Sequence, residues 1–156
     1  MGAEARLAGL GLVLPEPRKP MAGYTMATST GGVLYLSGHP STGRSALLGR
    51  VPDEVSPDEA HAAAQSVALD LLATIRSVTG SLDAVERILA VTVMVNAAPG
   101  FGGHPQIADG ASSLLSDLYG ESGIHSRVAF GVSSLPGNAT LEISMVAALL
   151  PAGQAL

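Results

Sequence analysis

The sequence predicts a single α+β domain in which two helices cover one face of a β-sheet. Two segments with helical periodicity alternate with segments of strand character, in the order β-β-α-β-α-β-β. The last strand segment, 139–150, is apolar on both faces. The length of 156 residues is typical of one domain, so we expect one core within residues 1–156 and an N-terminal extension over residues 1–20.

The N-terminal part of the chain predicts a short helix followed by a hairpin. Residues 3–9 favour a short helix, and the proline-rich stretch that follows cannot continue it. Residues 22–30 and 33–38 have the character of strands, and Gly31-Gly32 between them suits a two-residue hairpin turn. Residues 39–52 show neither the helical period of about 3.6 residues nor the alternation of a strand, so we expect a loop there.

The first long helix has clear start and stop signals. Ser56 suits the N-cap, Pro57 the first helical position, and Glu59 would complete a capping box. Gly80 is a natural stop. Apolar residues recur every three or four positions and predict one buried face, made of Ala60, Ala64, Val67, Leu71, Ile75 and Val78 and widened by Ala63, Ala68 and Leu72.

The second half of the chain predicts three strands and one more helix. Residues 86–96 resemble a buried strand, and residues 104–119 have helical periodicity. A strand over 126–132 is joined by a turn at 135–138 to the last strand, 139–150. Because this last strand is apolar on both faces, the face of the sheet without helices needs cover, and self-association is the obvious source.

Composition narrows the classes of partner. Hydrophobic residues make up 47% and charged residues only 13%, which is too little charge to cover a small domain and favours an oligomer. The net charge of −5 and the aromatic content of 3% argue against a nucleic-acid partner. The absence of Cys excludes disulfides and thiolate metal sites, and the four His show no metal-ligand spacing.

Nothing in the sequence indicates export or membrane insertion. The N-terminal apolar run lacks the pattern of a cleaved signal, and no stretch reaches the roughly 18 apolar residues of a membrane span. We therefore expect a cytoplasmic protein without a membrane partner.

Two charged residues interrupt strongly apolar strands. Arg127 and Glu142 lie in consecutive strands joined by a short turn, so the two side chains can lie close together. A charge in such a strand must be paired or must face a cavity, because its unpaired burial is costly. The pattern is compatible with a buried ion pair or with an anion-binding Arg beside a poised carboxylate.

These residues lie in motifs that resemble a known family. The stretch HSRVAFGVSSLPGNATLEI, residues 125–143, resembles the signature of the YjgF/RidA deaminases, in which an Arg is followed by Leu-Pro and then by a Glu. Tyr24, followed 13 positions later by Ser37-Gly38, is similar to the family's Tyr and its SG(Q) turn. The segments VNAAPGF and DGASSLL resemble the longer-chain branch, which carries an N-terminal extension.

The resemblance implies a homotrimer of chorismate-mutase-like protomers with sites in the clefts between subunits. Such proteins hydrolyse small reactive 2-imino or enamino acids to 2-keto acids and ammonia, without a metal or organic cofactor. By this resemblance Arg127 would grip the substrate carboxylate, Glu142 would position or activate water, and Tyr24 would close the pocket. Backbone groups around Ser37 and Gly38 would contact the substrate.

Three further positions of the implied site depart from the family pattern. His39 stands where Gln is usual, Ala129 where some members have Cys, and Asp109 where Asn is frequent. If Asp109 faces the cleft, its charge weakens carboxylate binding unless it is protonated or paired. These departures leave two alternatives open, which are a pathway-specific enzyme of secondary metabolism (a condensation or cyclisation) and a non-catalytic trimer that binds a small carboxylate. Some family members have been called ribonucleases, but the acidic balance argues against that activity here.

Overall fold

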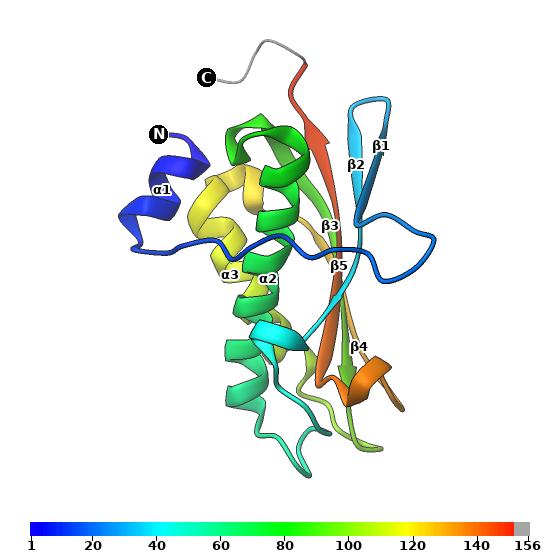
Figure 1. Cartoon of the computed structure of the whole chain (residues 1–156). Coiled ribbons are helices and arrows are strands. Elements are labelled where there is room, and N and C mark those ends of the chain that lie inside the picture. The colour runs from blue at the N-terminus through cyan, green and yellow to red at the C-terminus, as the bar shows by residue number, and fades with distance from the viewer. Residues whose placement is uncertain (152–156) are drawn as a thin grey trace.

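The computed structural model describes residues 1–151 and has the predicted α+β architecture (Figure 1). Residues 152–156 of the expected domain lie outside the described part. The sheet has five strands in the order β1-β2-β5-β3-β4; β3 and β4 run parallel, and all other neighbours are antiparallel. The elements are α1 (Ala3–Gly9), β1 (Ala27–Thr30), β2 (Val33–Pro40), α2 (Pro57–Thr79), β3 (Val85–Asn96), α3 (His104–Tyr119), β4 (Ser126–Val132) and β5 (Leu141–Leu149).

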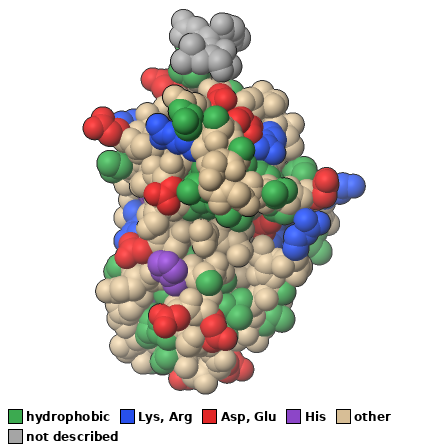
Figure 2. Space-filling view, turned by 90° about the vertical axis from the view of Figure 1, so that its left-hand side faces the viewer, with side chains coloured by type: hydrophobic (Ala, Val, Ile, Leu, Met, Phe, Trp, Pro, Cys, Tyr) green, Lys and Arg blue, Asp and Glu red, His purple; other side chains and the backbone are tan. Residues whose placement is uncertain are grey.

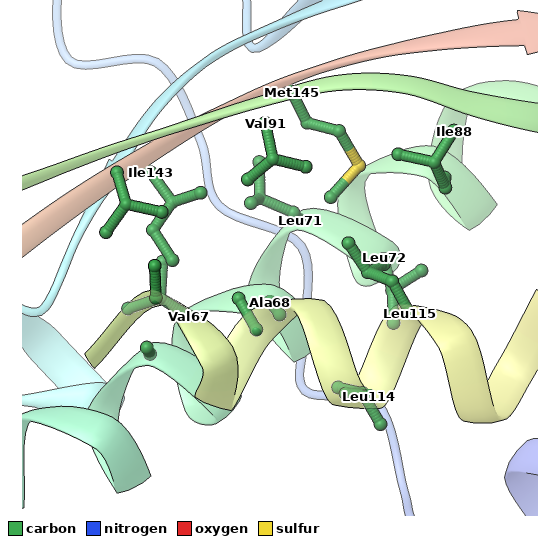
Figure 3. Packing of buried hydrophobic residues seen from close by; sticks show 14 of the residues in the cluster. Val67, Ala68, Leu71, Leu72, Ile88, Val91, Leu114, Leu115, Ile143 and Met145 are labelled. Atoms are coloured by element: carbon green, nitrogen blue, oxygen red, sulfur yellow. The ribbon is translucent and has the colours of Figure 1, made fainter. Parts of the chain in front are cut away.

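Helices α2 and α3 lie side by side on one face of the sheet, as predicted (Figure 1). Alternate residues of β3 and β5 point toward these helices and are almost completely buried, among them Val91, Ile143 and Met145 (Figure 3). They pack in one cluster with Leu71 and Leu115 from the helices. Burying side chains of this size stabilises a fold by about 1.5–3 kcal/mol each, so this layer dominates the energetics.

The predicted helix limits are confirmed, with one correction to the buried face. The Ser56 hydroxyl accepts a hydrogen bond from the Glu59 amide, while the Glu59 carboxylate accepts one from the Ser56 amide. Gly80 ends α2 in the left-handed conformation. Val78 was expected on the buried face but is 53% exposed, because the packed part of α2 ends at Ile75 and the last turn extends beyond it.

The predicted hairpin forms, but its first strand is shorter than expected. Gly31 and Gly32 both have positive φ, as a tight turn requires, and β1 begins at Ala27 rather than at residue 22. Residues 22–26 form a loop instead, because Ser37 of β2 binds that loop: its amide donates to the Met26 carbonyl at 2.9 Å. The second strand continues to Pro40, past a shift of register with β5 between Leu36 and His39.

The N-terminal extension is packed onto the domain. The Glu4 carboxylate of α1 pairs with Arg76 of α2, and the chain then crosses in front of α2 toward the helix-free side (Figure 1). Arg18 anchors this crossing, donating from Nε and Nη2 to the Asp70 carboxylate at 3.0 and 2.5 Å. The Asp70 side chain on α2 is only 4% exposed and also accepts a hydrogen bond from the Ser45 hydroxyl. The extension is thus tied to a buried charge.

The helical side of the molecule carries charges of both signs. Figure 2 shows this side, where Lys and Arg side chains are scattered among acidic ones and form no continuous basic stripe. Within residues 1–151, no helix is long and apolar enough to cross a membrane.

The anchoring of the extension is testable by substitution. Arg18→Ala leaves the buried Asp70 carboxylate without its counter-charge, so we expect the free energy of unfolding to fall by about 3 kcal/mol. Urea unfolding at neutral pH measures this, with the exposed Arg44→Ala as the matched control. Adding Asp70→Asn to Arg18→Ala should recover part of the loss, because no charge is then buried. An Arg18→Ala variant as stable as the Arg44→Ala control would contradict the anchoring role.

Candidate functional site

Arg127 lies on β4, the edge strand of the sheet, and faces α3. Its Nη1 donates to the Asp109 carboxylate at 2.8 Å and to the Ser112 hydroxyl at 3.0 Å. Asp109 and Ser112 are three positions apart on α3 and therefore share one face of that helix. The Arg127 side chain is 24% exposed and that of Asp109 is 54% exposed, so the ion pair lies at the surface of the edge.

A chain of hydrogen bonds continues from Arg127 through Ser112 to His125. The His125 Nδ1 lies 2.6 Å from the Gly123 carbonyl oxygen, which can only accept a hydrogen bond, so Nδ1 carries the proton. In the neutral ring Nε2 is then an acceptor, and the Ser112 hydroxyl at 3.0 Å donates to it. We call Arg127, Asp109, Ser112 and His125 the edge cluster.

The edge cluster uses only part of the Arg127 guanidinium. Within the described chain, neither Nε nor Nη2 of Arg127 has a hydrogen-bond partner. One edge of the guanidinium therefore remains available to a carboxylate, which it can bind through two parallel hydrogen bonds. Ala129 lies two residues along β4 on the same face and packs partly against the core.

Glu142 lies on the opposite face of the sheet from Arg127. Its neighbours on β5, Leu141 and Ile143, are completely buried toward the helices, so the Glu142 side chain points to the helix-free face. The expectation that Arg127 and Glu142 lie close together is therefore wrong for one protomer. Arg127 pairs with Asp109 instead, because the side chains of a strand alternate between the two faces.

Glu142 is adjacent to Gly38 on the helix-free face. A Cβ atom at Gly38 would come within 2.0 Å of the Glu142 Oε1, so a side chain at position 38 would displace this carboxylate. Burial raises the pKa of the Glu142 carboxyl group above its ordinary value. In residues 1–151, the carboxylate has no hydrogen-bond or salt-bridge partner that would oppose this effect.

Ser37 precedes Gly38 on β2 and holds the loop that carries Tyr24. The Ser37 hydroxyl donates to the Thr25 carbonyl at 2.6 Å, which holds the loop containing Tyr24 against β2. Tyr24 is 51% exposed, and its loop projects on the helix-free side of the sheet (Figure 1). We call Glu142, Gly38, Ser37 and Tyr24 the open-face cluster.

The backbone groups of Ser37 are already engaged within the chain. Its amide donates to the Met26 carbonyl, and its carbonyl oxygen accepts a hydrogen bond from the His39 ring. Gly38, by contrast, lies in the stretch where the β2–β5 register shifts. Of the two expected backbone contacts, Gly38 is the better placed for a ligand.

His39 does not face a ligand, which corrects the role expected for it. Its side chain is completely buried, with Nδ1 2.8 Å from the Ser37 carbonyl oxygen and Nε2 2.9 Å from the Thr74 hydroxyl of α2. Burial lowers the pKa of the His39 imidazole. His39 is thus a structural residue between the sheet and α2.

Ser112 and His125 were not identified from the sequence as site residues. Ser112 lies three positions after Asp109 and so shares its face of the helix, and this spacing is the only feature of the sequence that connects Ser112 with the site. The contact with His125 depends on how α3 and β4 pack, which no local pattern encodes. Among residues 1–151, no three His, Asp or Glu side chains group as metal ligands.

The chain matches a known family model and a curated protein over nearly its whole length. Residues 4–149 match the model of the family described as "YjgF/chorismate mutase-like, putative endoribonuclease". Protein TCP17 of Trypanosoma cruzi is 32% identical over 148 residues, which cover 93% of this chain and 92% of that protein.

Two solved structures are similar over nearly their whole length. The protein Atu1372 from Agrobacterium tumefaciens, described as of unknown function, is 32% identical with a TM-score of 0.86, over 95% of this chain and 92% of that chain. A chain from Shewanella oneidensis MR-1 is 27% identical with a TM-score of 0.90, over 96% of this chain and 100% of that chain.

The environment of Glu142 predicts a pH-dependent effect on stability. Because the pKa of Glu142 is raised on folding, the folded state holds this proton more tightly than the unfolded chain does. Below the unfolded pKa of about 4.3 both states are protonated, and as the pH rises from there to the folded pKa the wild type loses stability relative to Glu142→Gln.

Thermal unfolding between about pH 4 and pH 8 measures this difference, since that range begins near the ordinary carboxyl pKa and extends well above it. We expect the melting temperature of Glu142→Gln minus that of the wild type to increase with pH. Ser144→Ala, which changes an uncharged residue on the same face of β5, is the control. A difference that stays flat or shrinks as the pH rises would show that burial does not act on this carboxyl.

Proposed function

Because the chain belongs to the YjgF/chorismate mutase-like family, we propose that it hydrolyses small 2-imino or enamino acids to 2-keto acids and ammonia. Family membership supports a small-molecule-processing role. The proposed reaction takes place in clefts between the protomers of a homotrimer and uses no metal or organic cofactor.

The observation that carries this proposal is the separation of the two charged clusters. Arg127 lies at the β4 edge on the helical side, and Glu142 lies on the helix-free face. A site that uses both groups must therefore take them from two copies of the chain. If the helix-free face of one protomer packs beside the β4 edge of the next, Glu142 of the partner subunit approaches Arg127.

The helix-free face has the character of a surface between copies. Tyr35, Val128 and Phe130 are 41–57% exposed, and each alternates along its strand with residues that face the helices. The low charge content of the chain makes this face difficult to keep in water. A symmetric assembly of identical chains covers it without another partner.

In the proposed cleft Arg127 binds the substrate carboxylate through Nε and Nη2. Asp109 does not compete for these atoms, because it is already paired with Nη1. The negative charge of Asp109 nevertheless reduces the net positive charge of the edge cluster. We therefore expect the site to prefer substrates with one carboxylate.

Hydrolysis then requires two proton transfers. The oxygen of a water molecule bonds to the imine carbon, and a proton must reach the nitrogen so that ammonia leaves as the carbon–oxygen double bond forms. A carboxyl group of raised pKa can accept a proton from the water and return it to the nitrogen near neutral pH. Glu142 would do this, Gly38 would contact the substrate through its backbone, and Tyr24 would close the pocket.

The assembly is the first expected outcome. Light scattering at micromolar concentration should give the mass of a trimer for the wild type. Phe130→Glu introduces a charge into the helix-free face and should give monomers, because burying it unpaired costs several kcal/mol. Val78→Glu makes the same change at an exposed position of α2 and should remain trimeric. A stable wild-type monomer would refute both the trimer and the cleft between subunits.

The activity is the second expected outcome. An amino-acid oxidase generates the 2-imino acid in place, and release of the 2-keto acid is followed above the spontaneous rate. Glu142→Gln should reduce this catalysed rate by about a hundredfold or more, the usual share of general acid–base catalysis. Arg127→Lys should weaken substrate binding, because an ammonium cannot reproduce the two-pronged contact.

The exposed Arg44→Ala variant is the control and should keep full activity. The wild type could be trimeric and bind 2-keto acids in calorimetry but release no keto acid from the imine. That outcome would contradict the deaminase activity and would indicate a non-catalytic carboxylate-binding trimer. A Glu142→Gln variant with full activity would remove Glu142 from the mechanism.

A further inference from the structure

A second hollow lies at the far end of β4, away from Arg127. Its volume is about 400 Å³, within the range of small-ligand pockets. Arg50, Phe101, His104 and Ser133 line it, together with the backbone at Gly131 near the end of β4. Arg127 stands at the start of the same strand, four residues before Gly131, so this hollow is separate from the edge cluster. We call it the Arg50 hollow.

The shape of the Arg50 hollow depends on two glycines. Phe101 and His104 pack edge to face, with ring centroids 5.1 Å apart and an interplanar angle of 75°. A Cβ atom at Gly103 would lie 2.7 Å from the Phe101 ring, and one at Gly131 would lie 2.6 Å from the His104 Nε2. Any larger residue at either position would displace these rings, so the two glycines allow the rings to form this wall of the hollow.

The positive charge of the hollow comes from Arg50, whose guanidinium is not engaged in a salt bridge with any described residue. In residues 1–151 no carboxylate forms a salt bridge with Arg50, whose Nη2 donates only weakly to the Ser133 carbonyl at 3.4 Å. The acidic residues nearest in sequence are Asp53 and Glu54, and the Glu54 carboxylate accepts its hydrogen bond from the Arg50 backbone amide and not from the guanidinium. Helix α3 begins at His104 in the wall of the hollow, and no side chain caps its first turn.

A neighbouring polar hollow shares Arg50 and Ser133 with the Arg50 hollow. It is lined by Arg50, Asp53, Glu54, Asn96, Ser133, Ser134 and Asn138. Asn96 is 97% buried, and its Nδ2 donates to the Asn138 Oδ1 at 3.3 Å. Its Oδ1 has no partner among the described residues, and a buried acceptor of this kind requires a donor. Arg50 therefore lies between two hollows, and the unpartnered acceptor belongs to the neighbouring one and not to the Arg50 hollow.

We propose that the Arg50 hollow binds a small organic acid with one carboxylate and a compact apolar body. The carboxylate lies against Arg50, which supplies charge-assisted hydrogen bonds, and against the His104 ring, which can donate a further hydrogen bond. The apolar body lies against the Phe101 ring and the side chains of Ala97, Pro99 and Val132. This site is additional to the proposed cleft at Arg127 and does not depend on the deaminase activity.

Nuclear magnetic resonance of the ¹⁵N-labelled full-length protein tests the site, with benzoate as the probe. We expect benzoate to shift the amide signals of Gly100, Gly131 and Ser133 in a saturable manner. Arg50→Gln should weaken this binding by about tenfold or more, as expected for loss of a charged hydrogen bond. Arg44→Gln, the matched change at an exposed arginine, should leave the binding unchanged.

Three further measurements distinguish this site from the cleft at Arg127 and from a general anion site. The Arg127→Lys variant should bind benzoate in the Arg50 hollow as the wild type does. Benzoate binding there can therefore be confirmed even if the proposed deaminase activity is not found. Gly131→Ala should also weaken binding by displacing His104, and it serves if Arg50→Gln does not fold. Inorganic phosphate should produce much smaller shifts, because it cannot use the apolar wall.

The proposal is overturned if benzoate shifts none of these amides in the wild type. It is also overturned if Arg50→Gln and Gly131→Ala, both folded, bind benzoate as tightly as the wild type. Equal binding of phosphate and benzoate would show a general anion site and would exclude the organic-acid preference.

Discussion

The packing of α2 and α3 against alternate residues of β3 and β5 determines which side of each strand is buried. Val91, Ile143 and Met145 point into this layer, so the residues between them must point to the other side. No helix in the described chain covers that other side (Figure 1). The uncovered face, the positions of the charged residues and the proposed assembly all follow from this one asymmetry.

The same alternation distributes the chemistry of the molecule over two faces. Arg127 occurs at a helix-facing position of β4, where Asp109 and Ser112 meet it. Glu142 occurs at a position of β5 on the opposite face, where Gly38 leaves room for it. Within one protomer Arg127 pairs with Asp109, and Glu142 has no basic partner among the described residues. A buried Arg–Glu pair is therefore excluded within one chain, and the proposed site between copies would bring the two groups together.

A single irregularity in β2 explains why His39 is a core residue. Leu34 and Leu36 face the helices, so regular alternation would turn Gly38 inward and His39 outward. The register shift between Leu36 and His39 reverses this order. His39 then points inward and meets Thr74, while Gly38 approaches Glu142 on the other face. The bulge thus places a polar side chain in the core and a glycine in the candidate site.

The sequence by itself determined the order of the elements, the capping box at Ser56, most of the buried face of α2 and the uncovered face of the sheet. These features depend on residues close together along the chain, and local periodicity encodes them. It also marked Arg127 and Glu142 as unusual, because each interrupts an apolar strand. Only the tertiary structure decided that Arg127 pairs with Asp109, that Ser112 connects it to His125, and that His39 is buried. Those contacts depend on strand register, on one bulge and on the packing of α3 against β4, which join residues distant in sequence and leave no periodic trace in it.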